Sequence, residues 1–290
     1  MSTIRKKSKR PTMKFAYANA KKFEEADYIL FGVPDETGSH SELKGVSLAP
    51  NTIRKISNER FGIKRGNKIS LFQPQQGVLP KIYDYGNVKK KEVEGLAEKI
   101  VEARKKPILL GGDHSITYEV LKGISKVKEV SFVYFDAHPD FISSERHYYG
   151  SVICDISELK NVKVKQSIEI GIRVPEAEEL YNLRKYHVKT ITSLELTQIG
   201  IHKALERIRS MIKNYIYVSI DMDVLDPAFA PGVNTPIPGG MSSSELIFLA
   251  KNTFRLRGVG LDIMEVNPKR DVNDITSQLA TSLIIETIAL

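Results

Sequence analysis

The chain has 290 residues, of which 41% are hydrophobic and 27% are charged, so it can bury a substantial core and is not a disordered chain. Its only cysteine, Cys154, excludes an internal disulfide and a thiolate metal site and favours a reducing compartment, for which we predict the cytoplasm. The net charge of +8 comes from lysines that lie beside glutamates and cluster only near the N-terminus, so we predict a basic flexible tail at 1–12, a single domain at 13–290, and no nucleic-acid or membrane partner.

Apolar, β-branched runs alternate along the chain with segments of helical periodicity. In chain order we predict strand 26–34, helix 48–58, helix 89–106, strand 107–112, helix 115–126, strand 130–137, strand 166–173, helix 175–186, strand 187–192, helix 194–214, strand 215–222, helix 242–254, strand 257–264 and helix 274–289. Because the strand runs are almost continuously apolar, both faces of the sheet should be buried. This pattern predicts an α/β fold with a mostly parallel sheet covered by helices on either side.

Acidic residues and histidines follow four of these strands. They are Asp113 and His114, then Asp136, His138 and Asp140, then Asp221 and Asp223, and finally Asp262 and Glu265. The carboxyl ends of parallel strands lie along one edge of a sheet, where open α/β folds place their ligands, so these side chains should converge. The long loop 226–241 at the same edge is a further candidate for the site.

The segment FDAHPD places Asp136, His138 and Asp140 at every-second spacing, which directs the three side chains toward one target. Asp221 and Asp223 have the same spacing. Each motif alone is also compatible with a capped turn, but unpaired carboxylates in one crevice would repel each other, and a metal is the simplest neutraliser. Four aspartates and two histidines are too many for one tetrahedral zinc ion and suit a pair of ions, with manganese favoured over iron, cobalt or zinc.

Four motifs resemble those of the ureohydrolases, the family of agmatinase and arginase. They are GGDHS (111–115), DAHPD (136–140), SIDMDVLDPAFAPGVNTPIPGG (219–240) and LDIMEVNP (261–268), and GVSLAPNTIR (45–54) resembles an earlier family segment at the substrate end. The resemblance, closest to agmatinase, implies a three-layer α/β/α sandwich, two Mn²⁺ per chain, and a homotrimer or homohexamer. It implies these ligands: His114 and Asp140 for one ion, His138 and Asp223 for the other, and Asp136 and Asp221 as bridges.

The same resemblance implies hydrolysis of a linear guanidino compound, best matched by the conversion of agmatine to putrescine and urea. Two Lewis-acid ions would activate a bridging water, Glu265 would hold the guanidinium, and Asp140 would pass a proton to the leaving amine. The alternatives are another ureohydrolase (arginase, guanidinobutyrase or formimidoylglutamase), or a metal-bound paralogue without catalysis that binds a polyamine or a partner.

The loop after DAHPD departs from the family pattern. Ureohydrolases usually have a His-Gly pair there, whereas this chain reads ERHYYG, with Tyr149 before Gly150 and the nearest histidine at His147. We predict that His147 acts in catalysis and substrate binding and that Tyr149 binds substrate; the alternative for His147 is an exposed loop residue. Ile237 is a second departure, at a position where agmatinases often have an acidic residue.

Overall fold

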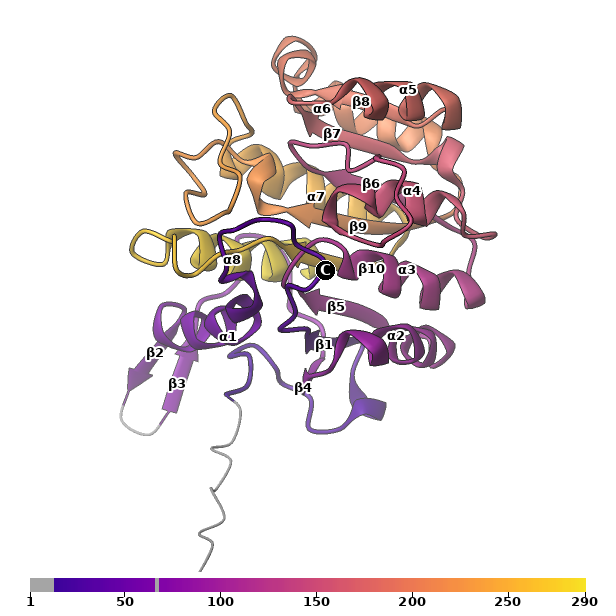
Figure 1. Cartoon of the computed structure of the whole chain (residues 1–290). Coiled ribbons are helices and arrows are strands. Elements are labelled where there is room, and N and C mark those ends of the chain that lie inside the picture. Colours follow the sequence, from indigo (N-terminus) through magenta and orange to yellow (C-terminus); the bar gives the residue numbers. More distant parts are fainter. Residues whose placement is uncertain (1–12, 66–67) are drawn as a thin grey trace, which may run out of the picture.

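A central sheet of eight parallel strands organises the chain (Figure 1). The computed structural model describes residues 13–65 and 68–290, so the predicted tail at 1–12 lies outside the described residues. The sheet strands are β1 (Tyr28–Gly32), β4 (Ile82–Asn87), β5 (Lys106–Leu110), β6 (Val130–Phe135), β7 (Ile168–Ile172), β8 (Lys189–Thr192), β9 (Tyr215–Asp221) and β10 (Gly258–Met264). Their order is β4-β1-β5-β10-β9-β6-β7-β8, and β2 (Gly62–Arg65) and β3 (Lys68–Leu71) form a separate antiparallel pair.

Helices cover both faces of this sheet (Figure 1). One face carries α2 (Val93–Glu102), α3 (Ile116–Val127), α4 (Val152–Ser157) and α5 (Ala177–Tyr186), and the other carries α1 (Ala49–Glu59), α6 (Ser193–Met211), α7 (Ser243–Arg257) and α8 (Ile275–Ile288). Strand side chains alternate between the two cores, so Val133 and Phe135 face α6 to α8 while Phe132 and Tyr134 face α2 to α5. The prediction of a three-layer α/β/α sandwich with a parallel sheet is confirmed.

The predicted elements differ from the observed ones where local sequence is ambiguous. Strand β4 is absent from the prediction because it is an edge strand in which buried and exposed residues alternate, and its Asp84 is a poor strand former. The short α4 lies in a segment for which no helix or strand was predicted. The helix predicted at 89–106 ends at Glu102, since Lys106 already begins β5, and the helix predicted at 194–214 is broken at Gly200, whose φ is 76°.

A buried ion pair attaches α1 to the edge of the sheet. Arg54 is fully buried, and its Nε and Nη2 donate to the two carboxylate oxygens of Asp84 at 2.9 and 3.0 Å. Its Nη1 also donates to Asn87 Oδ1 at 2.6 Å. The arginine of the GVSLAPNTIR motif therefore links α1 to β4 through a bidentate buried ion pair and does not line the pocket described below.

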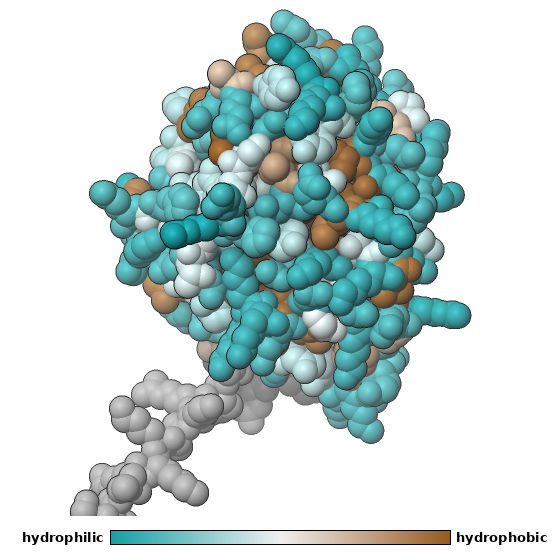
Figure 2. Space-filling view, turned by 45° about the vertical axis from the view of Figure 1, so that its right-hand side comes forward, coloured by the Kyte–Doolittle hydropathy of each residue, from teal (hydrophilic) through white to brown (hydrophobic). Residues whose placement is uncertain are grey.

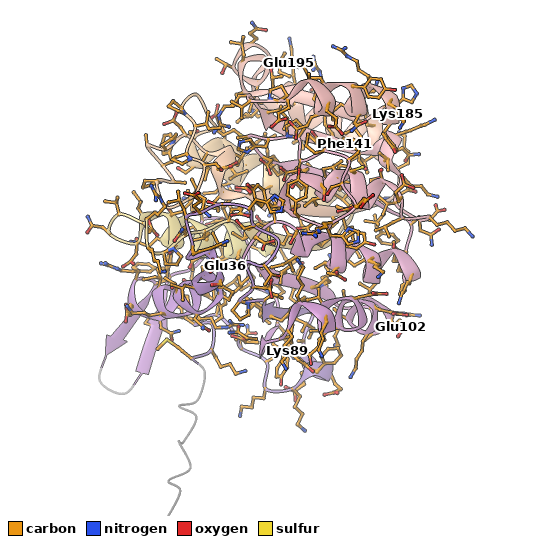
Figure 3. The ribbon with its side chains drawn as sticks, viewed as in Figure 1. Glu36, Lys89, Glu102, Phe141, Lys185 and Glu195 are labelled. Carbon is orange, nitrogen blue, oxygen red and sulfur yellow. The ribbon has the colours of Figure 1, made fainter. Side chains whose placement is uncertain are left out.

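The outer surface of the sandwich is polar. Figure 2 shows one face covered mainly by hydrophilic side chains, with apolar ones in small separate patches. Charged side chains such as Lys89, Glu102 and Lys185 are exposed on the outside of the helical layers (Figure 3). Within the described residues, no helix combines the length and the apolar character that crossing a membrane requires.

Candidate metal centre

The four adjacent central strands bring the predicted ligands to one edge of the sheet. In the sheet, β5, β10, β9 and β6 are neighbours, although β5 and β10 are about 150 residues apart in the chain. His114 follows β5, Glu265 follows β10, Asp221 ends β9, and Asp136 follows β6. Strand order therefore makes neighbours of side chains that are distant in sequence, as expected at the carboxyl edge of a parallel sheet.

The first group of ligands surrounds the imidazole of His114. Its Nδ1 lies 3.2 Å from Asp136 Oδ2 and 3.1 Å from Asp221 Oδ2. Its Nε2 lies 2.8 Å from Ser219 Oγ, and that hydroxyl donates to Asp262 Oδ1 at 2.7 Å. Because the serine proton is directed to Asp262, the serine oxygen accepts from Nε2–H, and this network assigns the free lone pair to Nδ1. A histidine fixed in this way presents Nδ1 as a metal ligand.

The second group surrounds His138 and shares one aspartate with the first. His138 Nδ1 lies 3.1 Å from Asp223 Oδ2 and 3.4 Å from Asp136 Oδ1. Asp136 thus directs one carboxylate oxygen to each histidine, which is the geometry of a bridging ligand. Thr235, in the loop 226–241, donates to Asp223 Oδ2 at 2.7 Å, so this long loop supports the second group.

Asp140 lies beside these two groups without joining either. Its Oδ2 is 3.8 Å from His114 Nδ1 and accepts a hydrogen bond of 2.6 Å from the hydroxyl of Tyr134. Asp140 also has a φ of 48°, in the left-handed region that non-glycine residues rarely adopt. Its role as a ligand of the first ion stays a prediction.

The electrostatics of the cluster fit a pair of divalent cations. Burial, and then the charges of neighbouring aspartates, raise the pKa values of Asp140 and Asp221 well above their usual range. Burial opposes protonation of His138, but the carboxylates of Asp136 and Asp223 outweigh it and raise its pKa to about 12. Asp136 Oδ2 is buried and has no hydrogen-bond partner among the described residues. Two cations would replace these protons and satisfy the orphaned oxygen.

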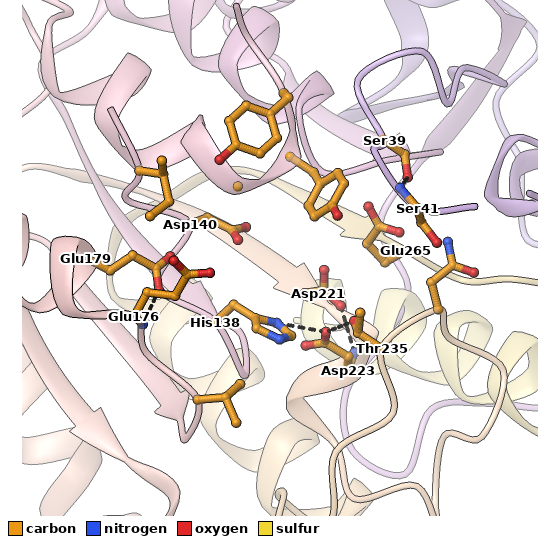
Figure 4. A pocket seen from close by; sticks show the side chains of 16 residues that line it. Ser39, Ser41, His138, Asp140, Glu176, Glu179, Asp221, Asp223, Thr235 and Glu265 are labelled. Atoms are coloured by element: carbon orange, nitrogen blue, oxygen red, sulfur yellow. Dashed lines mark hydrogen bonds and ion pairs between the residues drawn. The ribbon is translucent and has the colours of Figure 1, made fainter. Parts of the chain in front are cut away.

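The centre opens into a cavity of about 240 Å³ (Figure 4). Glu265 lines this cavity, accepts a hydrogen bond from the backbone N–H of His114 at 2.9 Å, and has a left-handed φ of 61°. Burial, with the nearby Asp113 carboxylate acting in the same direction, raises its pKa to about 8. The cavity wall consists of Ser39, Ser41, His138, Asp140, Ile142, Tyr148, Tyr149, Gly150, Val174, Glu176, Glu179, Asp221, Asp223, Asn234, Thr235 and Glu265.

The two tyrosines that precede Gly150 line the cavity, whereas His147 lies outside it. Tyr149 lines the cavity, as does Tyr148, whose ring stacks on His40 at 4.4 Å between centroids. His147 does not line the cavity: its Nδ1 lies 2.9 Å from Asp155 Oδ1, and its ring stacks on Tyr118. The His147 side chain is 54% exposed, and the structure places it apart from the other predicted site residues.

Several site residues were not predicted from the sequence. Tyr134 could have been found, because it continues the every-second spacing of Asp136, His138 and Asp140 toward the strand. Glu176 and Glu179 follow β7, so the same edge of the sheet places them beside the cavity. Thr235 carries no local signal, since only the path of its loop brings it to Asp223.

Comparisons with known proteins identify the family of this centre. The sequence model of the Arginase family matches residues 26–289, nearly the whole described chain. The chain belongs to the arginase family. It is 30% identical over 275 residues to an agmatinase of Blochmanniella floridana, covering 90% of this chain and 87% of that one. It is 30% identical over 280 residues to a proclavaminate amidinohydrolase of Streptomyces clavuligerus, with the same coverages.

The solved structures agree with this placement. The agmatine ureohydrolase of Thermoplasma volcanium superposes with a TM-score of 0.81 at 31% identity, covering 95% of this chain and 93% of that one. This arginase-family chain is therefore an enzyme, a metal-dependent amidinohydrolase. The two histidine–carboxylate groups that share Asp136 agree with the dinuclear metal centre of the family.

Proposed function

We propose that the enzyme is a dimanganese agmatinase, which hydrolyses agmatine to putrescine and urea. The observation that carries this proposal is a pair of histidine–carboxylate groups sharing Asp136, at the base of a cavity that also contains glutamates on both sides. Manganese is favoured because the ligands are oxygen-rich with two imidazoles and no sulfur. Within this proposal, His114 and Asp140 would hold one ion, His138 and Asp223 would hold the other, and Asp136 and Asp221 would be shared between them.

The charge of the cavity supports a substrate with two cationic ends. Four aspartate ligands are neutralised by two divalent ions, while Glu265, Glu176 and Glu179 add further negative charge. Figure 4 shows Glu176 and Glu179 on the opposite side of Asp140 and His138 from Glu265. The cavity-lining residues named above include no lysine or arginine. A guanidinium beside Glu265 and an ammonium toward Glu176 match this arrangement, whereas guanidinobutyrate and formiminoglutamate would direct a carboxylate toward acids.

Each residue then has a defined task. When bound, the two ions supply Lewis acidity and a water activated near neutral pH. Glu265 orients the planar guanidinium through charge-assisted hydrogen bonds, and Tyr149 contributes an aromatic wall that suits a cation. Asp140 carries the proton that the leaving amine needs, a transfer worth about 10²–10⁴-fold in rate. We further propose a cytoplasmic homotrimer or homohexamer.

The proposal is tested by loading the protein with Mn²⁺ and supplying agmatine, arginine, 4-guanidinobutyrate and formiminoglutamate, with urea or formamide as the readout. We expect the highest kcat/KM for agmatine. Glu176→Gln should lower kcat/KM for agmatine only about two- to fivefold, because the Glu176 side chain is exposed and its charge is screened by solvent. The same substitution should reduce the preference for agmatine over 4-guanidinobutyrate. Glu178→Gln is the matched control, since Glu178 is exposed in the first turn of α5, does not line the cavity, and as glutamine keeps the oxygen that accepts from the Ser143 backbone N–H. A preference for 4-guanidinobutyrate would contradict the choice of agmatine.

A further inference from the structure

Tyr134 is a fully buried tyrosine whose hydroxyl contacts two of the predicted metal ligands. It lies on β6, two residues before Asp136, and its side chain is on the face of the sheet covered by α3 and α4. Its hydroxyl donates to Asp140 Oδ2 at 2.6 Å and lies 3.0 Å from His114 Nδ1. Its ring stacks on the His114 imidazole, with centroids 4.5 Å apart and planes 16° apart. One side chain therefore contacts both of the ligands proposed for the first ion.

The contacts of Tyr134 add constraints on both ligands to those that their other neighbours supply. The left-handed backbone of Asp140 is a strained conformation, which persists only when surrounding contacts hold it. Ser219 holds one edge of the His114 ring and Asp136 and Asp221 face its Nδ1, while Tyr134 packs on the flat face of the ring. The second group has no such cover, since the His138 side chain is 27% exposed.

We propose that Tyr134 is a positioning residue for the first ion: its ring sets the plane of His114, and its hydroxyl fixes the Asp140 carboxylate beside His114 by donating to Oδ2. This inference rests on the proposed dinuclear centre. It predicts an effect confined to one of the two ions, because the hydrogen bonds and the ring stacking of Tyr134 are directed to His114 and Asp140 rather than to His138 or Asp223. Partners that orient metal ligands typically change metal affinity by about 10- to 100-fold when removed.

The test is the metal affinity of Tyr134→Phe, which keeps the stacked ring and removes only the hydroxyl. Metal content and Mn²⁺ paramagnetic resonance are measured in the full chain at increasing free Mn²⁺. We expect one ion to bind about 10- to 100-fold more weakly and the other to bind as in the wild type, so that uncoupled mononuclear signals appear where the wild type is dinuclear. Tyr17→Phe is the matched control, because Tyr17 is also buried and its hydroxyl has no hydrogen-bond partner among the described residues.

Three outcomes separate this inference from the function on which it rests. Wild-type protein that binds fewer than two ions would refute the dinuclear centre itself. Two ions bound by Tyr134→Phe with wild-type affinities, even with a lowered unfolding temperature, would reduce Tyr134 to a structural residue and overturn the inference. A visible phenolate-to-iron charge-transfer band in the Fe³⁺-loaded wild type, absent from Tyr134→Phe, would also overturn it, because Tyr134 would then be a ligand.

Discussion

Glu169 is a buried carboxyl group whose replacement should stabilise the protein. It lies on β7 between Tyr134 of β6 and Thr190 of β8, is 0% exposed, and neither of its carboxylate oxygens has a hydrogen-bond partner among the described residues. Burial, and then the charges of Asp136 and Asp140, raise its pKa well above the usual range. Glu169→Gln keeps the shape of the side chain and removes its titration.

The size of the effect follows from proton linkage. A raised pKa means that the folded state retains a proton that the unfolded state loses above about pH 4.3, so the stability contributed by that proton is lost as pH rises toward the folded-state pKa. For each pH unit between the pKa of Glu169 in the unfolded state and its pKa in the folded state, the free energy of unfolding of the wild type falls by up to about 1.4 kcal/mol. The loss between pH 5 and pH 7 is therefore up to about 3 kcal/mol. Glu169→Gln escapes this loss, so its advantage should be small at pH 5 and largest at pH 7.

The assay is thermal unfolding of wild type and Glu169→Gln at pH 5, 6 and 7, in EDTA so that metal binding adds no pH dependence of its own. An advantage of about 3 kcal/mol corresponds to roughly 6–12 °C in unfolding temperature. Glu206→Gln, at an exposed position on α6, is the control and should change stability by less than about 0.5 kcal/mol. A variant that is less stable at pH 7, or an advantage that does not change with pH, would refute the reasoning, because Glu169 would then be ionised with a stabilising partner.

Three further predictions concern the site. Because the pKa of His138 in the metal-free centre is about 12, metal binding should displace its proton. The calorimetric enthalpy of metal binding should then vary with the ionisation enthalpy of the buffer, and the affinity for the metal should rise with pH. A binding enthalpy that does not depend on the buffer would contradict this. Glu265→Gln should lower kcat/KM for the guanidino substrate about 10- to 150-fold, through loss of a charge-assisted hydrogen bond, with two ions still bound; an accompanying loss of metal would instead make Glu265 part of the metal site. His147→Ala should change kcat less than about threefold in steady-state assays, and a loss of about 10²–10⁴-fold would mean that the loop moves His147 into catalysis.

Much of the fold was predictable because the responsible signals are local. Apolar runs identified six of the sheet strands, since a strand buried on both faces needs apolar residues at nearly every position, and edge strand β8 was predicted from its β-branched residues. Edge strand β4 was not predicted, because half of its side chains are solvated and its Asp84 is paired with the distant Arg54. Its place in the sheet therefore depends on a partner that local pattern does not show.

The sequence by itself determined the type of centre. Every-second spacing in FDAHPD, together with the acids and the histidine that follow three other strands, is enough to predict a convergent set of metal ligands. Tertiary structure decided which oxygen faces which nitrogen. Asp136 lies two residues from His138, but it reaches His114 only because the sheet order brings β5 and β6 together around β10 and β9, and Tyr134 bonds Asp140, whose backbone is left-handed.

The difference between local sequence pattern and tertiary structure also explains why the positions of His147 and Glu176 were not predicted. His147 lies in a loop and Glu176 at the start of a helix, so sequence position alone did not indicate where their side chains lie: His147 pairs with Asp155, and Glu176 lines the cavity beyond the end of β7. Residue types and their period are encoded locally and determine the class of chemistry. Strand order and loop paths arise from packing between distant segments, and they determine which of those residues face one another across the cavity of this arginase-family enzyme.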